Sequence, residues 1–272
     1  MRVLIYTSYD GTGYCGWQKQ DNGVSVEEKL NAAISALFKT RIEVIGASRT
    51  DAGVHSEGAA AVFDCETRMP AEKICYALNQ RLPEDIRVIK SEMVADEFHP
   101  RHCDSEKTYE YRIWNSRFEN PLNRLYTDHV HVFLDTDKMK EAAEYLVGEH
   151  DYTSFASTKA EVESFVRTIY SIEVESVEES TDRPNLYMDE NSIQGTGSGQ
   201  DELFHGREIR IRVTGNGFLY NMVRIIAGTL LDIGQGKRDP MDIFTILEAK
   251  DRSAAGPTAP AHGLTLMKYE FL

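Results

Sequence analysis

The stretch GASRTDAGVHSEG, residues 46–58, holds the residues whose types and spacing could do chemistry. Asp51 follows Arg49 by two positions and precedes His55 by four. An arginine near a carboxylate lowers the pKa of that carboxylate, and an ionised carboxylate can act as a nucleophile or a base. Two other interpretations stay open on these residues alone. Asp51 could cap a glycine turn, or it could bind a metal ion with His55, although no further ligand lies at an informative spacing.

The elements that must position this loop are short strands and amphipathic helices. Strands are predicted at 42–47 and 59–64, on either side of the loop, and a glycine-rich segment, DGTGYCGWQKQ, follows a strand at 2–7. Ser25 and Glu28 form a capping box that predicts a helix start. The further predicted elements are helices at 25–39, 70–82, 137–148, 218–234 and 241–249 and strands at 86–94, 108–115, 167–177, 207–215 and 264–272.

This order predicts an α+β protein with two halves, each a sheet backed by helices. The polar, turn-prone segment 99–108 marks the hinge, which gives an N-terminal domain over 1–104 and a C-terminal domain over 105–272. The second domain carries an acidic, glycine-rich insert at about 180–206 that composition assigns to the surface.

Composition describes a soluble globular protein, with 41% hydrophobic and 27% charged residues. No apolar run is long enough to cross a bilayer, and MRVLIYTSYD reads as a strand rather than a secretory signal, so we expect a cytoplasmic protein without membrane contact. The four cysteines lack paired spacing, which predicts reduced thiols. The chain carries a formal charge of -14, yet its first half holds a series of basic residues that could line a basic cleft: Arg41, Arg49, Arg81, Arg87, Arg101, Lys107, Arg112, Arg117 and Arg124.

Several aromatic and basic residues could contact a nucleic acid. Tyr14 and Trp17, in the glycine-rich segment, are either part of a surface turn or flat groups that stack on unpaired bases. Tyr109 alternates with Glu110 along a predicted strand and could touch a substrate at the edge of its face. Arg224 interrupts an apolar helix, so it either reaches out to water or pairs with a carboxylate in a cleft.

Four segments follow one another over almost the whole chain: DGTGYCGWQKQ, SRTDAGVHSEG, GNGFLYNMVRIIAG and GPTAPAHGLTL. Together they resemble the signature segments of the TruA-type tRNA pseudouridine synthases, and SEKTYEYRI and DYTSFAS add to the resemblance. The resemblance implies that Asp51 is the catalytic aspartate, that Tyr109 lies against the target base, that Arg224 pairs with the aspartate and that Arg49 holds or expels the target nucleotide. Tyr14, Trp17, Arg101 and Lys107 are further expected contacts to RNA.

The resemblance also implies a fold and a reaction. The fold would consist of two ferredoxin-like α/β halves whose sheets join across a central active-site cleft. The enzyme would isomerise uridine to pseudouridine at positions 38, 39 and 40 of the tRNA anticodon stem-loop, without cofactor or metal, as a homodimer in which one tRNA touches both subunits. An ionised Asp51 could attack the ribose or the uracil ring of a flipped-out uridine, or remove a ribose proton.

Two functions of other classes remain as alternatives. A noncatalytic RNA-binding protein on the same two halves would bind tRNA without isomerising it. A hydrolase using Asp51 and His55 with a divalent metal would be inhibited by chelators.

Overall fold

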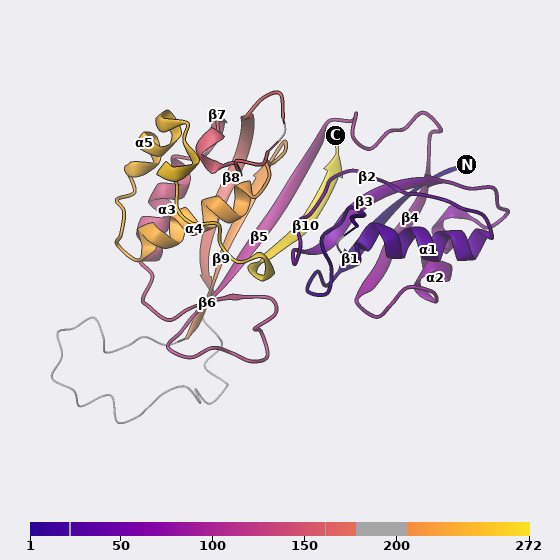
Figure 1. Ribbon diagram of the computed structural model, residues 1–272, viewed down its shortest axis with the longest axis horizontal. Helices are drawn as coiled ribbons and strands as arrows, with labels where there is room; N and C mark the ends of the chain where they lie inside the picture. Colours follow the sequence, from indigo (N-terminus) through magenta and orange to yellow (C-terminus); the bar gives the residue numbers. More distant parts are fainter. Residues whose placement is uncertain (22, 161, 178–205) are drawn as a thin grey trace. The chain divides into compact units, whose positions relative to one another are not determined.

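The computed structural model describes residues 1–21, 23–160, 162–177 and 206–272. Within these ranges the protein is mixed α+β, with five α-helices and ten strands (Figure 1). Contacts divide the chain into two compact units, Met1–Tyr109 with Leu264–Leu272, and Glu110–Gly263. The predicted α+β class is confirmed. The predicted acidic insert at about 180–206 lies almost entirely outside the described residues.

The first unit is built on strands in the order β4-β1-β3-β10, with β2 paired to β3. β1 pairs antiparallel with both β3 and β4, whereas β10 pairs parallel with β3. The last strand therefore belongs to the first unit, which differs from the predicted domain boundary, because its hydrogen-bonding partner β3 lies there. The elements of this unit are β1 (Arg2–Tyr9), α1 (Val26–Phe38), β2 (Ile45–Gly46), β3 (His55–Asp64), α2 (Ala71–Asn79), β4 (Ile86–Val94) and β10 (Leu264–Phe271).

Both faces of β3 are buried, which explains its almost continuous apolar run. One face holds Leu4 and Val62 in a cluster with Tyr269, and the opposite face receives α1, whose Phe38 ring lies 6.0 Å from that of Phe63. Helix α1 starts as its sequence predicts, because the Ser25 hydroxyl accepts a hydrogen bond from the Glu28 main-chain N–H at 3.2 Å. The predicted strand at 42–47 is wrong in extent, since only Ile45–Gly46 pairs with β3.

The strands of the second unit follow the order β5-β9-β8-β7, with β6 paired to β5, and the first residues of β5, up to Tyr109, belong to the first unit. Ile209, Ile211 and Val213 alternate along β9 and are fully buried, as are Ile225, Ile226 and Leu230 of α4. One face of this sheet is thus apolar core, as the period-two pattern predicts. The elements are β5 (Ser105–Asn115), β6 (Asp128–Val130), α3 (Thr136–Glu144), β7 (Gly148–Asp151), β8 (Val166–Val177), β9 (Arg207–Gly215), α4 (Met222–Gly234) and α5 (Asp242–Ala249).

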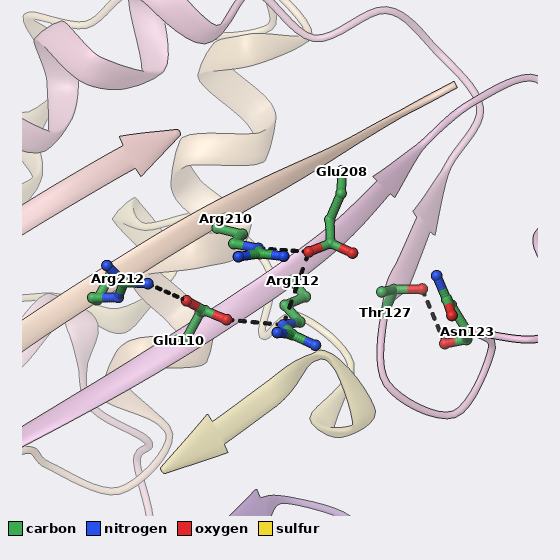
Figure 2. Close-up of polar contacts among 7 residues, drawn as sticks. All are labelled: Glu110, Arg112, Asn123, Thr127, Glu208, Arg210 and Arg212. Carbon is green, nitrogen blue, oxygen red and sulfur yellow. Dashed lines mark hydrogen bonds and ion pairs between the residues drawn. The ribbon is translucent and has the colours of Figure 1, made fainter. Parts of the chain in front are cut away.

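The other face of β5 and β9 carries an ion-pair cluster, Glu110, Arg112, Glu208, Arg210 and Arg212 (Figure 2). Glu110, whose side chain is 1% exposed, accepts from Arg112 Nε at 2.8 Å and from Arg212 Nη2 at 2.7 Å. Burial alone would raise the pKa of Glu110, but the hydrogen bonds and charges of the two arginines outweigh burial and lower it. The Glu110 carboxylate therefore links β5 to β9, one residue after Tyr109.

We expect Glu110→Gln to destabilise the protein by about 1–3 kcal/mol at pH 7, because two partly buried guanidinium groups lose their carboxylate partner. A lowered pKa in the folded state means that this stabilisation is complete above the usual glutamate pKa and is lost as the pH falls through the lowered value. Urea unfolding from pH 7 to about pH 3 measures both effects. The difference between wild type and variant should shrink on acidification.

Glu173→Gln is the matched control, because Glu173 approaches the same Arg212 at 3.7 Å but its side chain is 56% exposed. Its effect should stay within about 0.5 kcal/mol. Equal destabilisation by the two substitutions would contradict a special role for the buried carboxylate.

Candidate active site

Asp51 lies in a tight turn between β2 and β3. Its main-chain oxygen accepts a hydrogen bond from the Val54 N–H at 3.1 Å, and Gly53 adopts a φ of 79°. The turn that the glycine predicts is therefore present, and the main chain of Asp51 closes it. Asp51 itself is half-buried, between the buried Thr50 and the exposed Ala52.

The glycine-rich segment that follows β1 packs directly against this turn. The Trp17 N–H donates to the Thr50 main-chain oxygen at 3.1 Å, and the Gly53 N–H donates to the Tyr14 oxygen at 3.3 Å. A Cβ at Gly11 would overlap the Val54 carbonyl group, and one at Gly16, where φ is +105°, would lie 2.7 Å from the Thr50 oxygen. Only glycine allows this close approach of two backbones. The two segments form one rigid support for Asp51.

His55 begins β3 and joins the same support. The ring is 3% exposed, and its Nδ1 accepts a hydrogen bond from the Gly11 N–H at 3.0 Å. Asp10 Oδ1 lies 3.2 Å from the same nitrogen. Nδ1 thus lies between a main-chain donor and a carboxylate oxygen, and both contacts tie the ring to the start of the glycine-rich segment. His55 thus holds the glycine-rich segment, and within the described ranges no group of three or more His, Cys, Asp or Glu side chains is arranged to hold a metal ion.

The expectation that Tyr14 and Trp17 present flat rings to RNA is wrong, because both rings are buried. Trp17 is 1% exposed, with its ring 6.1 Å from that of Tyr9. Tyr14 is 7% exposed and donates its hydroxyl to Asp85 Oδ1 at 2.7 Å. The backbone bonds of the glycine-rich segment fold these side chains inward, so they anchor the segment rather than offering it to a ligand.

Tyr109 is a buried phenol close to Asp51. Burial raises its pKa far above the usual value for tyrosine, and the charges of the nearby Tyr9 and Asp51 raise it further. The phenol therefore keeps its proton at neutral pH and can donate a hydrogen bond. The structure brings together in one unit the two residues to which the resemblance gives the central roles.

Three basic residues of the same unit differ in their contacts. Arg49, two positions before Asp51, is exposed. Arg101 is also exposed, and its Nε donates to the Gly46 oxygen at 2.8 Å, at the start of the segment that leads to Asp51. Lys107 Nζ lies 5.3 Å from the centre of the Tyr269 ring. The first two place positive charge along the chain that carries the aspartate.

Arg224 belongs to the second unit, on the first turn of α4. It is half-buried, and it donates from Nε to the Ala259 oxygen at 2.8 Å and from Nη1 to Asn221 Oδ1 at 2.9 Å. The Ala259 N–H in turn donates to the Arg224 oxygen at 3.1 Å. Two of the signature segments are thus bound to each other through this arginine. Its predicted pairing with Asp51 stays a prediction.

Tyr9 and Thr50 form a contact beside Asp51 that the sequence did not indicate. Their hydroxyl oxygens lie 2.8 Å apart in a buried position directly before Asp51. Thr50 belongs to the SRTD motif, which indicates a place near the site, whereas the sequence pattern shows Tyr9 only as the end of an apolar strand. Contact between residues so distant in sequence cannot be read from local pattern.

Comparison with known proteins identifies relatives along the whole chain. A family model described as tRNA pseudouridine synthase matches residues 5–102 and 142–271. A protein of Bacillus licheniformis named tRNA pseudouridine synthase A is 43% identical over 270 residues, covering 98% of each chain. Proteins of the same name from Thermoanaerobacter sp. and Bacillus subtilis are each 41% identical, over 266 and 268 residues, and cover at least 97% of both chains.

These matches confirm the resemblance inferred from the motifs. The family model covers the segments that carry Asp51 and Arg224, and Tyr109 lies between its two matched ranges. The identity is far above the level at which only a fold is shared. The chain belongs to the tRNA pseudouridine synthase family.

Proposed function

We propose that this isomerase, which converts uridine to pseudouridine in tRNA, acts at positions 38, 39 and 40 of the anticodon stem-loop, with Asp51 as its catalytic residue. The observation that carries the proposal is the turn of Asp51, clamped by the glycine-rich segment and close to the buried Tyr109 phenol, in a chain of this family. A binding module has no need for an aspartate held in this way.

The reaction breaks the bond between uracil N1 and ribose C1′ and forms one between C5 and C1′. The base must detach, rotate and reattach, while C5 loses a proton and N1 gains one, so no oxidant or reductant is consumed. The uridine must leave the stack to be reached, which costs a few kcal/mol. An ionised Asp51 starts the reaction by attack on the ribose, by attack on the uracil ring or by removal of a ribose proton.

The neighbouring residues have separate roles in this proposal. Tyr109 covers the base and relays the C5 proton, giving up its own phenolic proton as it accepts the one from C5. Arg224 pairs with Asp51 and keeps it charged in a poorly solvated site. Arg49 holds or expels the target nucleotide, and Arg101 and Lys107 contact the RNA backbone. Tyr14 and Trp17 have no direct contact with RNA.

The proposal includes the assembly and the location of the enzyme. Each of the two units has a ferredoxin-like α/β fold, and the enzyme works as a cytoplasmic homodimer in which one tRNA touches both subunits. No cofactor or metal takes part. In the part of the chain that the structure describes, the helices are too short or too polar to span a bilayer.

Asp51→Asn should abolish turnover, because the amide is neither a nucleophile nor a base at neutral pH. The measurement uses tRNA with tritium at uracil C5 and follows the label released to water. Label release that persists in the variant would remove Asp51 from the reaction. Tight tRNA binding without release by the unchanged protein would favour a noncatalytic RNA-binding protein, and inhibition by chelators would favour the metal-dependent hydrolase.

Arg224→Ala should lower kcat by about 100-fold, because a carboxylate in a poorly solvated site loses its charge partner. Arg238→Ala is the matched control, since Arg238 lies in the same unit, is half-buried and donates to the Ala254 carbonyl at 2.8 Å. Its kcat should stay close to that of the unchanged protein. Similar turnover in both variants would exclude Arg224 from the site.

Affinity for tRNA should fall as salt rises, since lysines and arginines that neutralise phosphates release counterions. Lys107→Gln should weaken binding and reduce the slope of log affinity against log salt by about one. Lys90→Gln, at an exposed lysine paired with Glu92, should leave the slope unchanged. Filter binding over about 50–300 mM salt measures the slope, and identical slopes for the two variants would remove Lys107 from the RNA interface.

A further inference from the structure

Tyr9 forms a buried hydroxyl pair with the residue that precedes Asp51. It is the last residue of β1 and is 4% exposed, and its Oη lies 2.8 Å from Thr50 Oγ1. Thr50 is 8% exposed. A hydroxyl group is costly to bury unless it is hydrogen-bonded, so each of these two groups stabilises the buried position of the other.

This pair fixes Thr50 at a second point. Its main-chain oxygen is held by the Trp17 N–H at 3.1 Å, and its side chain is held by Tyr9. A residue that is held through both backbone and side chain has little freedom to rotate, and the Cα of the next residue lies only about 3.8 Å away. The position of Asp51 is therefore set from strand β1 as well as from the glycine-rich segment.

Tyr9 is also close to the second central residue of the site. Its phenol contributes to the raised pKa of Tyr109, to which Asp51 contributes as well. Burial raises the pKa of Tyr9 itself above the usual tyrosine value, so Tyr9 stays neutral and its O–H remains a hydrogen-bonding group at neutral pH. The same side chain thus binds Thr50 and acts electrostatically on the phenol of Tyr109.

We infer that Tyr9 is a positioning residue for the isomerisation, whose hydroxyl holds Thr50 and thereby sets the place of the Asp51 carboxylate beside Tyr109. The inference rests on the proposed function. Packing alone would be served by phenylalanine, which has the same ring, so the hydroxyl is the group that the inference concerns. Displacement of a reacting group by about 1 Å can cost on the order of 100-fold in rate.

The test compares kcat and KM of Tyr9→Phe with those of the unchanged protein, by tritium release from tRNA at 25 °C. We expect kcat to fall by about 10- to 100-fold, while KM changes less than about twofold, because no group that touches the tRNA is removed. Thr50→Val should have the same effect, and Thr50→Ser, which keeps the hydroxyl, should retain most of the turnover. The double variant Tyr9→Phe/Thr50→Val should be no slower than the slower single variant, since each single variant already breaks the pair. The hydrogen bond between Tyr9 and Ser56 is lost equally in Tyr9→Phe and in the double variant.

Tyr152→Phe is the control for a merely structural role. Tyr152 is fully buried and donates its hydroxyl to the Leu146 oxygen at 2.6 Å, in the second unit. This variant should lower Tm and leave kcat unchanged. A Tyr9→Phe variant that loses Tm and keeps kcat in the same way would overturn the inference.

The remaining outcomes are also decisive. If Tyr9→Phe does not fold, Thr50→Val and Thr50→Ser supply the comparison, and equal kcat in these two would overturn the inference. Additive losses in the double variant would show that the two hydroxyls act separately and would overturn it too. Absence of turnover in the unchanged protein would overturn the proposed function, and this inference with it, whereas normal turnover in all Tyr9 and Thr50 variants would overturn the inference alone.

Discussion

The close approach of two backbones around Asp51 is the constraint on which the site depends. The glycine-rich segment donates from Trp17 and accepts at Tyr14, and the turn of Asp51 supplies the matching oxygen at Thr50 and the N–H at Gly53. Main-chain groups make these bonds, so the side chains of the two segments are not needed to hold them together. His55 closes the arrangement from β3 through its bond to the Gly11 N–H. A preorganised site of this kind needs little reorganisation free energy during the reaction, because the chain was already ordered when it folded.

Burial around this support determines the protonation states that the chemistry needs. Tyr9 and Tyr109 are both buried, and burial raises the pKa of each phenol, so both are hydrogen-bonding groups and not anions at neutral pH. Asp51, by contrast, is half-buried, and in the proposed reaction it acts as an ionised carboxylate. The proposal thus combines a neutral phenol with an ionised carboxylate, a pair of groups that can donate and accept protons.

Local pattern predicted the elements well and the environment of individual side chains poorly. The capping box at Ser25 and the alternation of β9 are short-range signals, and the structure confirms both. Trp17 shows why the rest could not be predicted. Its segment is rich in glycine and reads as an exposed loop, but bonds to Thr50, far along the chain, fold the ring into the core. Asp51 was found through a family motif, and no spacing rule would have joined Tyr9 to Thr50.

Counting basic residues along the sequence also overestimates the surface available to a polyanion. Arg41 is paired with Glu43, and Arg112 is bound by the buried Glu110, so the charge of each is largely compensated locally. Arg101 differs, because a carbonyl partner orients its guanidinium without neutralising it. Charges farther apart than about 8 Å are screened at physiological salt. An acidic chain can therefore attract RNA where a few uncompensated cations lie close to the aspartate, and the total charge of -14 says little about that place.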